Sequence, residues 1–172
     1  VGENASAVEE RLMREADIIA PVSRWLAGWI EGLRGHGRGV IVTPNGFDPA
    51  RFPRAARLDP DARRVVFIGH PKPWHGARTL VDLLAVSRRR GRPLALRIVG
   101  GGPGADQLAD LAREAGVTDD LEITGAVPPG AVLEALDGAS CTIAPYPRQD
   151  DFYFSPLKII DSLAAGLPVV TT

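Results

Sequence analysis

The stretch VVFIGHPKPWHGARTLVDLLAVSRRRGRPLALRIVG, residues 65–100, decides the fold. It holds two short apolar runs rich in β-branched residues, VVFIG and LALRIVG, and each run ends at a glycine. Between the runs, Leu80, Leu83 and Leu84 recur at the spacing of one helix face. A strand, a helix and a second strand in one stretch of this length predict a βαβ unit with parallel strands.

The same alternation continues to the last residue. Helices are predicted at 105–116 and 130–139 and from Ser155 onward, and strands at 121–125, 141–146 and 168–172. Five short strands separated by helices predict an α/β fold, a doubly wound, Rossmann-like parallel sheet with helices on both faces.

The residues before 65 follow a different rhythm. We expect helices at 3–15 and 24–34, strands at 17–22 and 40–44, and a turn at Asn45-Gly46. Two domains are therefore predicted: residues 1–45 as the end of one domain with a linker, and 46–172 as the Rossmann-like domain, incomplete at its C-terminus. The alternative is one sheet built from all 172 residues. Without an initiator Met, and with a strand at its last residues, the chain is interpreted as a piece of a longer protein.

Composition narrows the class of protein. The net charge of −1 gives no electrostatic reason to expect nucleic acid as a partner. The single cysteine, Cys141, allows no internal disulfide and fits a reducing compartment, so we expect a cytoplasmic protein. No apolar run reaches the roughly 18 residues of a membrane span, and no signal peptide is visible.

Ligands of doubly wound sheets bind where the strands end, so the loops after the strands are the candidate sites. The loop at 69–76 carries Lys72 and two histidines, and it leads into a helix N-terminus. A cation and free N–H groups at the positive end of a helix can hold a phosphate. The alternative is a solvated loop in which Trp74 packs. A zinc site is disfavoured, because no cysteine or acid stands at ligand spacing from the histidines.

The stretch IVGGGPGA, residues 98–105, matches a dinucleotide fingerprint through Gly100, Gly102 and Ala105. A dinucleotide fold also needs an acid at the end of the next strand, and Glu122 lies at the beginning of that strand. We therefore favour a tight turn in which the glycines admit close helix–strand packing. A flavin- or nicotinamide-binding oxidoreductase that uses 100–105 is the alternative.

The basic stretch SRRRGR, residues 87–92, ends the first helix of the repeat. Cations at a helix C-terminus complement the helix dipole, and this interpretation is favoured over a patch for an anionic membrane.

The stretch FYFSPLKIIDSLAAGLPVV, residues 152–170, combines a helix start with a buried-looking acid. Ser155 suits the N-cap and Pro156 the first helical position. The N–H groups of Leu157 and Lys158 would then form an anion site, and Asp161 could accept hydrogen bonds from sugar hydroxyls. The alternative is a surface ion pair between Lys158 and Asp161.

Taken in order, six segments resemble one family: ADIIAPVS (16–23), PNGFD (44–48), VVFIGHPKPWHG (65–76), RIVGGGPG (97–104), LEITGAVP (121–128) and SPLKIIDSLAAGLPVV (155–170). The chain resembles the retaining, GT-B-fold, nucleotide-sugar-dependent glycosyltransferases of the large family, of the glycosyltransferase family 4 type, that includes glycogen synthases and bacterial polysaccharide mannosyl- and glucosyltransferases. The resemblance is collinear over essentially the whole chain. It implies that 1–45 ends the acceptor-side domain and that 46–172 is the donor-binding domain.

The resemblance implies a role for each site residue. Lys72 and Asp161 are implied as catalytic, with Asp161 near the ribose. Substrate contacts are implied for the diphosphate and the base at Gly69, His70, His75, Gly76, Gly101, Gly125, Ala126, Val127, Ser155, Pro156, Leu157 and Lys158. Tyr153 is also assigned to substrate, although the family has an acid at its position, and His70 and His75 replace an Arg and a Lys of the family's first loop.

The implied reaction moves a sugar, with retention, from a UDP- or GDP-type nucleotide sugar to the hydroxyl of a carbohydrate, lipid-linked or small-molecule acceptor. No metal and no cofactor is expected. A membrane-surface association, peripheral on the inner face, could come from the missing domain, and the chain alone is expected to be inactive. A nucleotide-sugar epimerase and a non-catalytic nucleotide-sugar-binding module are the further alternatives.

Overall fold

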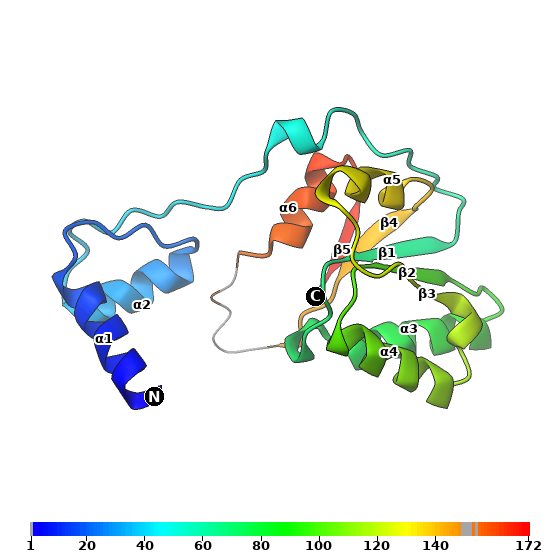
Figure 1. Ribbon diagram of the computed structural model, residues 1–172, viewed down its shortest axis with the longest axis horizontal. Coiled ribbons are helices and arrows are strands. Elements are labelled where there is room, and N and C mark those ends of the chain that lie inside the picture. Colours follow the sequence, from blue (N-terminus) through cyan, green and yellow to red (C-terminus); the bar gives the residue numbers. More distant parts are fainter. Residues whose placement is uncertain (1, 149–152, 154) are drawn as a thin grey trace. The chain divides into compact units, whose positions relative to one another are not determined.

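The computed structural model describes residues 2–148, 153 and 155–172 of the chain (Figure 1). By its internal contacts the chain divides into two compact units. The first unit comprises residues 1–46 and 149–157, and the second comprises residues 47–148 and 158–172. Each is described by itself.

The second unit is built on a five-stranded, all-parallel sheet with the order β3-β2-β1-β4-β5. In the register of the central strands, Phe67 lies opposite Ile98 and Val66 lies opposite Thr142. This confirms the predicted doubly wound α/β sheet. The strands are β1 (Arg64–Ile68), β2 (Ala95–Val99), β3 (Leu121–Ile123), β4 (Cys141–Ala144) and β5 (Val169–Thr171).

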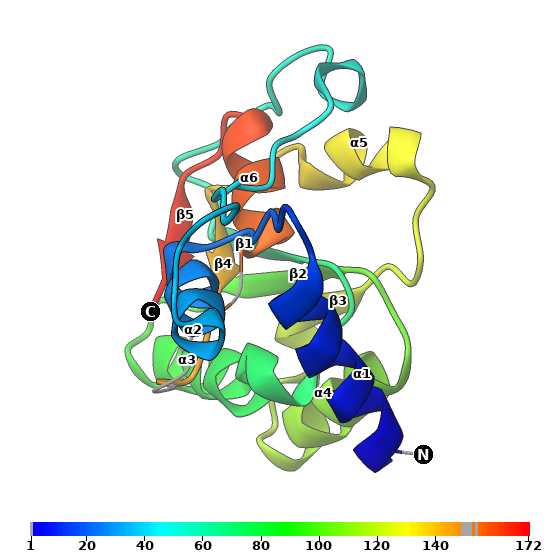
Figure 2. The same ribbon diagram turned by 90° about the vertical axis from the view of Figure 1, so that its left-hand side faces the viewer.

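Helices cover both faces of this sheet. Figures 1 and 2 show α3 and α4 on one face and α5 and α6 on the other. The α-helices are α3 (Ala77–Arg89), α4 (Pro103–Glu114), α5 (Val132–Leu136) and α6 (Leu157–Ala164), and the 3₁₀ turns are η1 (Pro49–Arg51), η2 (Pro73–His75), η3 (Thr118–Asp120) and η4 (Pro129–Ala131).

The central strand β1 supplies both halves of the core because side chains alternate along a strand. Val65 and Phe67 pack with α3, α4 and β2, whereas Val66 and Ile68 pack with α5 and the residues after α6. Phe67 is fully buried. Burying each such side chain contributes about 1.5–3 kcal/mol, so the apolar runs of the sequence become the middle layer of the fold.

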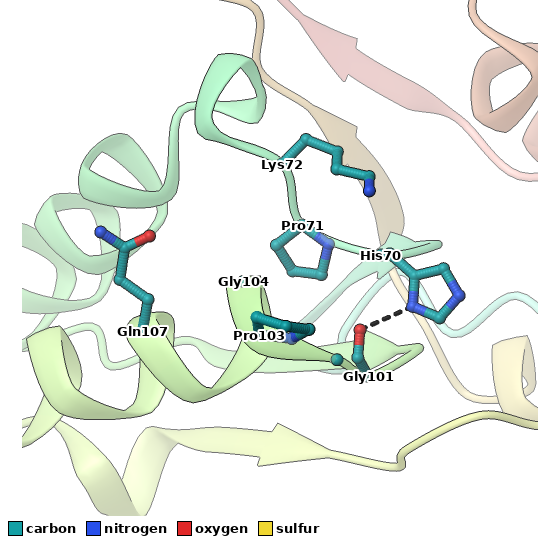
Figure 3. Close-up of a pocket in the computed structure, with 8 residues that line it drawn as sticks. His70, Pro71, Lys72, Gly101, Pro103, Gly104 and Gln107 are labelled. Atoms are coloured by element: carbon teal, nitrogen blue, oxygen red, sulfur yellow. Dashed lines mark hydrogen bonds between the residues drawn. The ribbon is translucent and has the colours of Figure 1, made fainter.

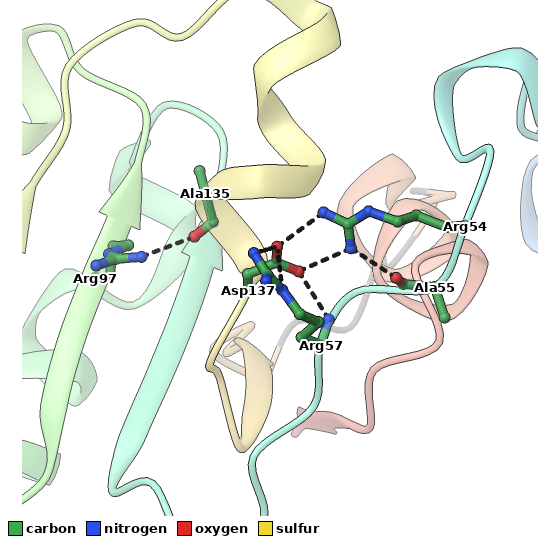
Figure 4. Close-up of polar contacts among 6 residues, drawn as sticks. All are labelled: Arg54, Ala55, Arg57, Arg97, Ala135 and Asp137. Carbon is green, nitrogen blue, oxygen red and sulfur yellow. Dashed lines mark hydrogen bonds and ion pairs between the residues drawn. The ribbon is translucent and has the colours of Figure 1, made fainter.

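The segment between the units' boundary and β1, residues 47–63, lies against the α5 and α6 face. The Ala56 N–H donates to the Ala165 carbonyl (2.8 Å), and the Gly138 N–H donates to the Arg57 carbonyl (2.8 Å). The carboxylate of Asp137, directly after α5, accepts from Arg54, from the Arg57 side chain and from the Arg57 backbone N–H (Figure 4). The segment is therefore attached to this face at several points.

The first unit contains two helices, α1 (Gly2–Glu15) and α2 (Arg24–Arg34). Ser23 caps α2 as predicted, since its Oγ accepts from the Leu26 N–H at 3.1 Å. The prediction of strands at 17–22 and 40–44 was wrong, because these segments form only an isolated parallel bridge, Ile19↔Val40. Two short segments without further neighbours cannot build a stable sheet.

Candidate functional site

In the sheet, β1 and β4 are neighbours. From β1 the chain adds β2 and β3 on one side, and from β4 it adds β5 on the other side. This is a topological switch point, where open α/β sheets bind ligands beyond the carboxyl ends of the strands. The segments that meet there follow β1, at residues 69–76, and β4, at Pro145 and Tyr146. The start of α6 brings Lys158 to the same place.

The ammonium of Lys158 is held by aromatic side chains and neutral acceptors. Its Nζ lies 2.9 Å from His75 Nε2 and 3.3 Å from the Tyr146 hydroxyl. The same atom lies 4.7 Å from the Phe67 ring centroid and 5.3 Å from that of Tyr146, which are cation–π distances. No carboxylate among the described residues pairs with it, and burial lowers the pKa of Lys158 to about 8.

The predicted alternative of a surface pair between Lys158 and Asp161 is therefore wrong. Asp161 pairs with Arg51 instead, at 3.7 Å. Lys158 and Asp161 lie one helical turn apart, and their side chains contact different neighbours. Lys158 contacts aromatic rings at the switch point, whereas Asp161 contacts Arg51.

His75 is a neutral hydrogen-bonding group in this arrangement. Lys158 can only donate, so Nε2 of His75 accepts and the ring proton is on Nδ1. Nδ1 lies 3.2 Å from the His70 carbonyl, to which the proton is donated in this tautomer, and 3.1 Å from the Lys72 backbone N–H. Burial, and then the neighbouring Lys158 charge, lowers the pKa of His75 to about 4. At neutral pH His75 therefore carries no charge, and the cation of this cluster is Lys158.

Tyr146 is the residue of this cluster that the sequence analysis missed. Its ring meets the His75 ring edge to face, with centroids 5.6 Å apart, and its side chain is 6% exposed. Burial raises the pKa of its hydroxyl, which therefore stays protonated. An aromatic residue two positions after a switch-point strand was the signal that could have identified it.

The loops after β1 and β2 enclose a cavity of about 490 Å³ (Figure 3). His70 and Lys72 line it from the first loop, and Gly101, Gly102 and Gln107 line it from the second loop and α4. The Nδ1–H of His70 donates to the Gly101 carbonyl at 2.6 Å, because a carbonyl can only accept. The structure thus brings together three of the predicted site residues, His70, Lys72 and Gly101, at the ends of neighbouring strands.

A second cavity, of about 240 Å³, lies over the ends of β1 and β2 on the side of α5. Gly69, Ala126 and Val127 line it, together with Arg51, which the sequence analysis did not single out. Arg51 is also the partner of the Asp161 carboxylate, and burial raises the pKa of Asp161 although the Arg51 charge opposes this shift. The Arg51–Asp161 pair joins η1 to α6 next to this cavity.

The glycines of residues 100–104 serve close packing of the chain on itself. A Cβ at Gly100 would lie 2.3 Å from the Gly69 carbonyl oxygen, and one at Gly104 would lie 1.9 Å from the Pro71 carbonyl oxygen. Gly101 approaches Gly125 in the same way, with its Cβ position 3.2 Å from the Gly125 Cα. These contacts account for the glycines without a dinucleotide, which favours the tight-turn interpretation.

Two more predicted glycines sit at special backbone positions. Gly76 adopts φ 61° as the N-cap of α3, beside Pro145, and Gly125 adopts φ 74° after β3. Both conformations are left-handed, a region that favours glycine.

Tyr153, Ser155, Pro156 and Leu157 belong to the first unit. There the Tyr153 carbonyl accepts from Ser23 Oγ (3.1 Å), and the Ser155 carbonyl accepts from Asn45 Nδ2 (3.0 Å). Helix α6 begins at Leu157, so Pro156 precedes the first helical residue that it was predicted to occupy. Their roles toward a ligand stay predictions.

Two features are absent from the residues that the structure describes. No group of three His, Cys, Asp or Glu side chains is arranged to hold a metal ion in that part of the chain. None of its helices combines the length and the apolar character that crossing a membrane requires.

Comparison with known proteins gives a consistent result. The family described as "Glycosyl transferases group 1" matches residues 62–172. A GDP-mannose-dependent alpha-(1-6)-phosphatidylinositol monomannoside mannosyltransferase of Mycobacterium tuberculosis is 33% identical over 72% of this chain and 34% of its own length. The glycogen synthase of the same organism is 29% identical over 96% of this chain and 40% of its length. A putative colanic acid biosynthesis glycosyltransferase of Escherichia coli is 24% identical over 95% of this chain and 41% of its length.

Solved structures share the fold. A sucrose-phosphate synthase from Thermosynechococcus elongatus superposes with a TM-score of 0.78 at 20% identity, covering 98% of this chain and 44% of that one. An Anabaena protein solved in complex with UDP and glucose gives 0.76 at 16% identity, covering 99% and 48%. The chain spans between about one third and two fifths of the length of the curated relatives it matches. On the family match and these relatives, the chain belongs to the glycosyl transferases group 1.

Proposed function

We propose that this chain contains the donor-binding half of a retaining glycosyltransferase that takes its sugar from a nucleoside diphosphate sugar. The second unit would be the donor domain, with its site at the carboxyl ends of β1, β2, β3 and β4. Residues 1–45 would be the end of the acceptor-side domain with the interdomain linker.

The observation that carries the proposal is the Lys158 ammonium at the switch point. A half-buried cation with no carboxylate partner among the residues that the structure describes is unfavourable on its own, as the pKa lowered to about 8 expresses. A diphosphate would supply the missing negative charge. The His75 and Tyr146 contacts hold Nζ in place before the ligand arrives, and Lys72 in the same β1 loop adds a second cation.

The Arg51–Asp161 pair supports the nucleoside part of the proposal. Asp161 is half-buried and keeps a carboxylate beside the cavity that Ala126 and Val127 line. A carboxylate accepts hydrogen bonds from both hydroxyls of a ribose. The backbone of 125–127 would then meet the base, and Asp161 the ribose.

In the proposed reaction the bond between the sugar's anomeric carbon and the diphosphate oxygen breaks, and the acceptor hydroxyl oxygen bonds to that carbon on the same face. The departing diphosphate oxygen keeps the electron pair of the broken bond and takes up the hydroxyl proton as the new bond forms. Charge accumulates on the departing diphosphate, and fixed cations placed beforehand stabilise it. Lys158 and Lys72 would supply this stabilisation together with the N-termini of α3 and α6.

The partners follow from the same proposal. The donor would be a UDP- or GDP-type sugar, since relatives named above include a GDP-mannose-dependent enzyme and a neighbour solved with UDP. The acceptor would be a carbohydrate, a lipid-linked or a small-molecule hydroxyl. We place the enzyme in the cytoplasm, with peripheral membrane contact through residues outside this chain as an option.

A thermal-shift panel of UDP, GDP, ADP and TDP sugars tests the proposal. We expect one base to raise the unfolding temperature, and the corresponding nucleoside diphosphate to bind in calorimetry without added metal. No shift with any of the four, at concentrations well above typical donor levels, would refute donor binding.

A second measurement separates transfer from the alternatives. The full-length enzyme, incubated with the selected nucleotide sugar, should form a glycosylated product only when an acceptor is present. An epimerised nucleotide sugar without acceptor would indicate an epimerase, and bound flavin released on denaturation would indicate the oxidoreductase. The 172-residue chain alone should bind the nucleotide weakly and should not turn over, and robust transfer by it would contradict this.

A further inference from the structure

The opposite end of the sheet carries a third cavity, of about 340 Å³, that the proposed donor site does not use. Arg63 lies directly before β1 and Leu94 directly before β2, so this cavity lies at the amino ends of the strands. Strands of five residues separate it from the donor site by roughly 16 Å. It is lined by Arg63, Leu83, Val86, Ser87, Arg90, Arg92 and Leu94.

The guanidinium groups of three arginines, Arg63, Arg90 and Arg92, surround this cavity. Within the described residues of the second unit, Arg63, Arg90 and Arg92 form no ion pair and no side-chain hydrogen bond. Other arginines of this unit do pair with carboxylates; they are Arg51, Arg54, Arg57, Arg78, Arg88, Arg97 and Arg113.

Capping of α3 does not account for these cations. Helix C-termini attract basic side chains because their last carbonyl groups lack partners. Here the backbone itself satisfies three of the last four carbonyls: the Arg90 N–H donates to Val86 (3.0 Å), the Gly91 N–H to Arg88 (2.9 Å) and the Arg92 N–H to Ser87 (3.0 Å). The three guanidinium groups therefore keep their full donor capacity.

The chemistry of the cavity fits a phosphate group attached to a partly apolar body. A guanidinium presents its donors in a planar fork that matches two phosphate oxygens. Three of them around one opening can neutralise a doubly charged phosphate. The floor is apolar, formed by Leu83, Val86 and Leu94, and the Ser87 hydroxyl is already engaged by the Leu84 carbonyl and the Leu94 N–H.

We propose that Arg63, Arg90 and Arg92 form a second phosphate-binding site, separate from the donor site and independent of the proposed function. The phosphate would belong either to a free phosphate compound or to an anionic lipid headgroup. Both kinds of ligand carry a phosphate group that the guanidinium groups can bind, and the experiment below distinguishes them.

The first arm titrates the ¹⁵N-labelled chain with inorganic pyrophosphate at physiological ionic strength. We expect chemical-shift changes at the amides of Arg63 and residues 90–94, apart from those at 69–76 that report the donor site. The double variant Arg90→Gln/Arg92→Gln should weaken the amino-end response about tenfold or more and leave the donor-end response intact. Arg89→Gln is the matched control, because Arg89 is exposed on the same helix end and does not line the cavity.

The second arm sediments the chain with vesicles of phosphatidylglycerol. Sedimentation lost in the double variant and kept in Arg89→Gln assigns the site to a lipid headgroup, whereas a pyrophosphate response without sedimentation assigns it to a soluble phosphate. The proposal is overturned if neither probe engages the amino end. It is also overturned if Arg89→Gln weakens the response as much as the double variant, which would indicate a diffuse charge effect.

Discussion

The side chains of Lys158 and His75 meet across the switch point of the sheet, with Nζ and Nε2 2.9 Å apart. Nε2 of His75 accepts, and Nδ1 of the same ring lies next to the His70 carbonyl and the Lys72 backbone N–H. A neutral imidazole thus fixes the position of an ammonium without neutralising it. A carboxylate in a salt bridge would neutralise the charge of Lys158, whereas the neutral imidazole leaves this charge available to a ligand.

Replacing Lys158 should change ligand binding and protein stability in opposite directions. Lys158→Met should weaken nucleoside diphosphate binding about 10- to 100-fold, the loss of one charge-assisted hydrogen bond of roughly 1.5–3 kcal/mol. In the empty protein the same change should raise the free energy of unfolding by on the order of 1 kcal/mol, because it removes a partly desolvated cation still screened by solvent.

Calorimetry and urea unfolding at neutral pH measure these two effects. Lys72→Met is the control for stability, since Lys72 is exposed and should leave the unfolding midpoint unchanged. Equal binding by Lys158→Met and the unchanged chain would contradict the role of Lys158.

The lowered pKa of Lys158 predicts opposite pH trends for binding and stability. The pKa is about 8 in the folded, empty chain and about 10.4 in an unfolded one. Between these values the unfolded chain binds more protons, so the contribution of Lys158 to stability rises with pH. A bound diphosphate favours the ammonium, so its affinity should fall as pH rises above about 8. Calorimetry in buffers of different ionisation enthalpy should show proton uptake on binding at pH 8, and Lys158→Met should abolish it.

Removing the Asp161 carboxylate should weaken binding of the nucleoside part of the ligand and leave binding of the phosphates unchanged. Asp161→Ala should weaken binding of the nucleoside diphosphate selected in the panel by about 1–3 kcal/mol, the range for leaving hydrogen-bonding groups unsatisfied. Inorganic pyrophosphate has no ribose, so its affinity for the donor site should change little. An equal loss for both ligands would show that Asp161 acts through the fold, by way of Arg51.

Gly104 should tolerate no side chain. Its Cβ position lies 1.9 Å from the Pro71 carbonyl oxygen, so Gly104→Ala must displace the β1 loop and should cost about 1–3 kcal/mol of stability. Gly130→Ala is the control, since nothing lies within 4 Å of its Cβ position. Urea unfolding compares them, and equal midpoints would show that the two loops do not approach this closely.

Asp137 should stabilise the chain at neutral pH and less so in acid. Its hydrogen bond from Arg54, followed by those from Arg57, holds the pKa of this carboxyl below its usual range. The stabilisation is therefore complete above the unfolded pKa of about 3.9 and is lost as pH falls through the folded value. Asp137→Asn should lower the free energy of unfolding at pH 7 by about 1 kcal/mol. The difference from the unchanged chain should shrink on acidification, and a difference that is constant with pH would contradict the ion-pair role.

The fold was predictable from the sequence because its signals are local. The apolar runs that became β1 and β2, and the leucines at helical spacing in α3, specify strand and helix within a few residues. Right-handed crossovers then leave few sheets to choose from. The expected strands at 17–22 and 40–44 failed for the complementary reason, since a strand also needs a neighbour that local sequence does not provide.

The candidate site was predictable only as a set of loops. The sequence by itself determined that Lys72, His75, Lys158 and Asp161 stand near strand ends, because strand ends are marked by glycine and proline. Tertiary structure alone decided that Lys158 turns to His75 and Tyr146 and that Asp161 turns to Arg51. The physical reason is that a side chain's protonation and direction depend on burial and on partners brought close by folding, such as Arg51, more than a hundred positions before Asp161 in the sequence.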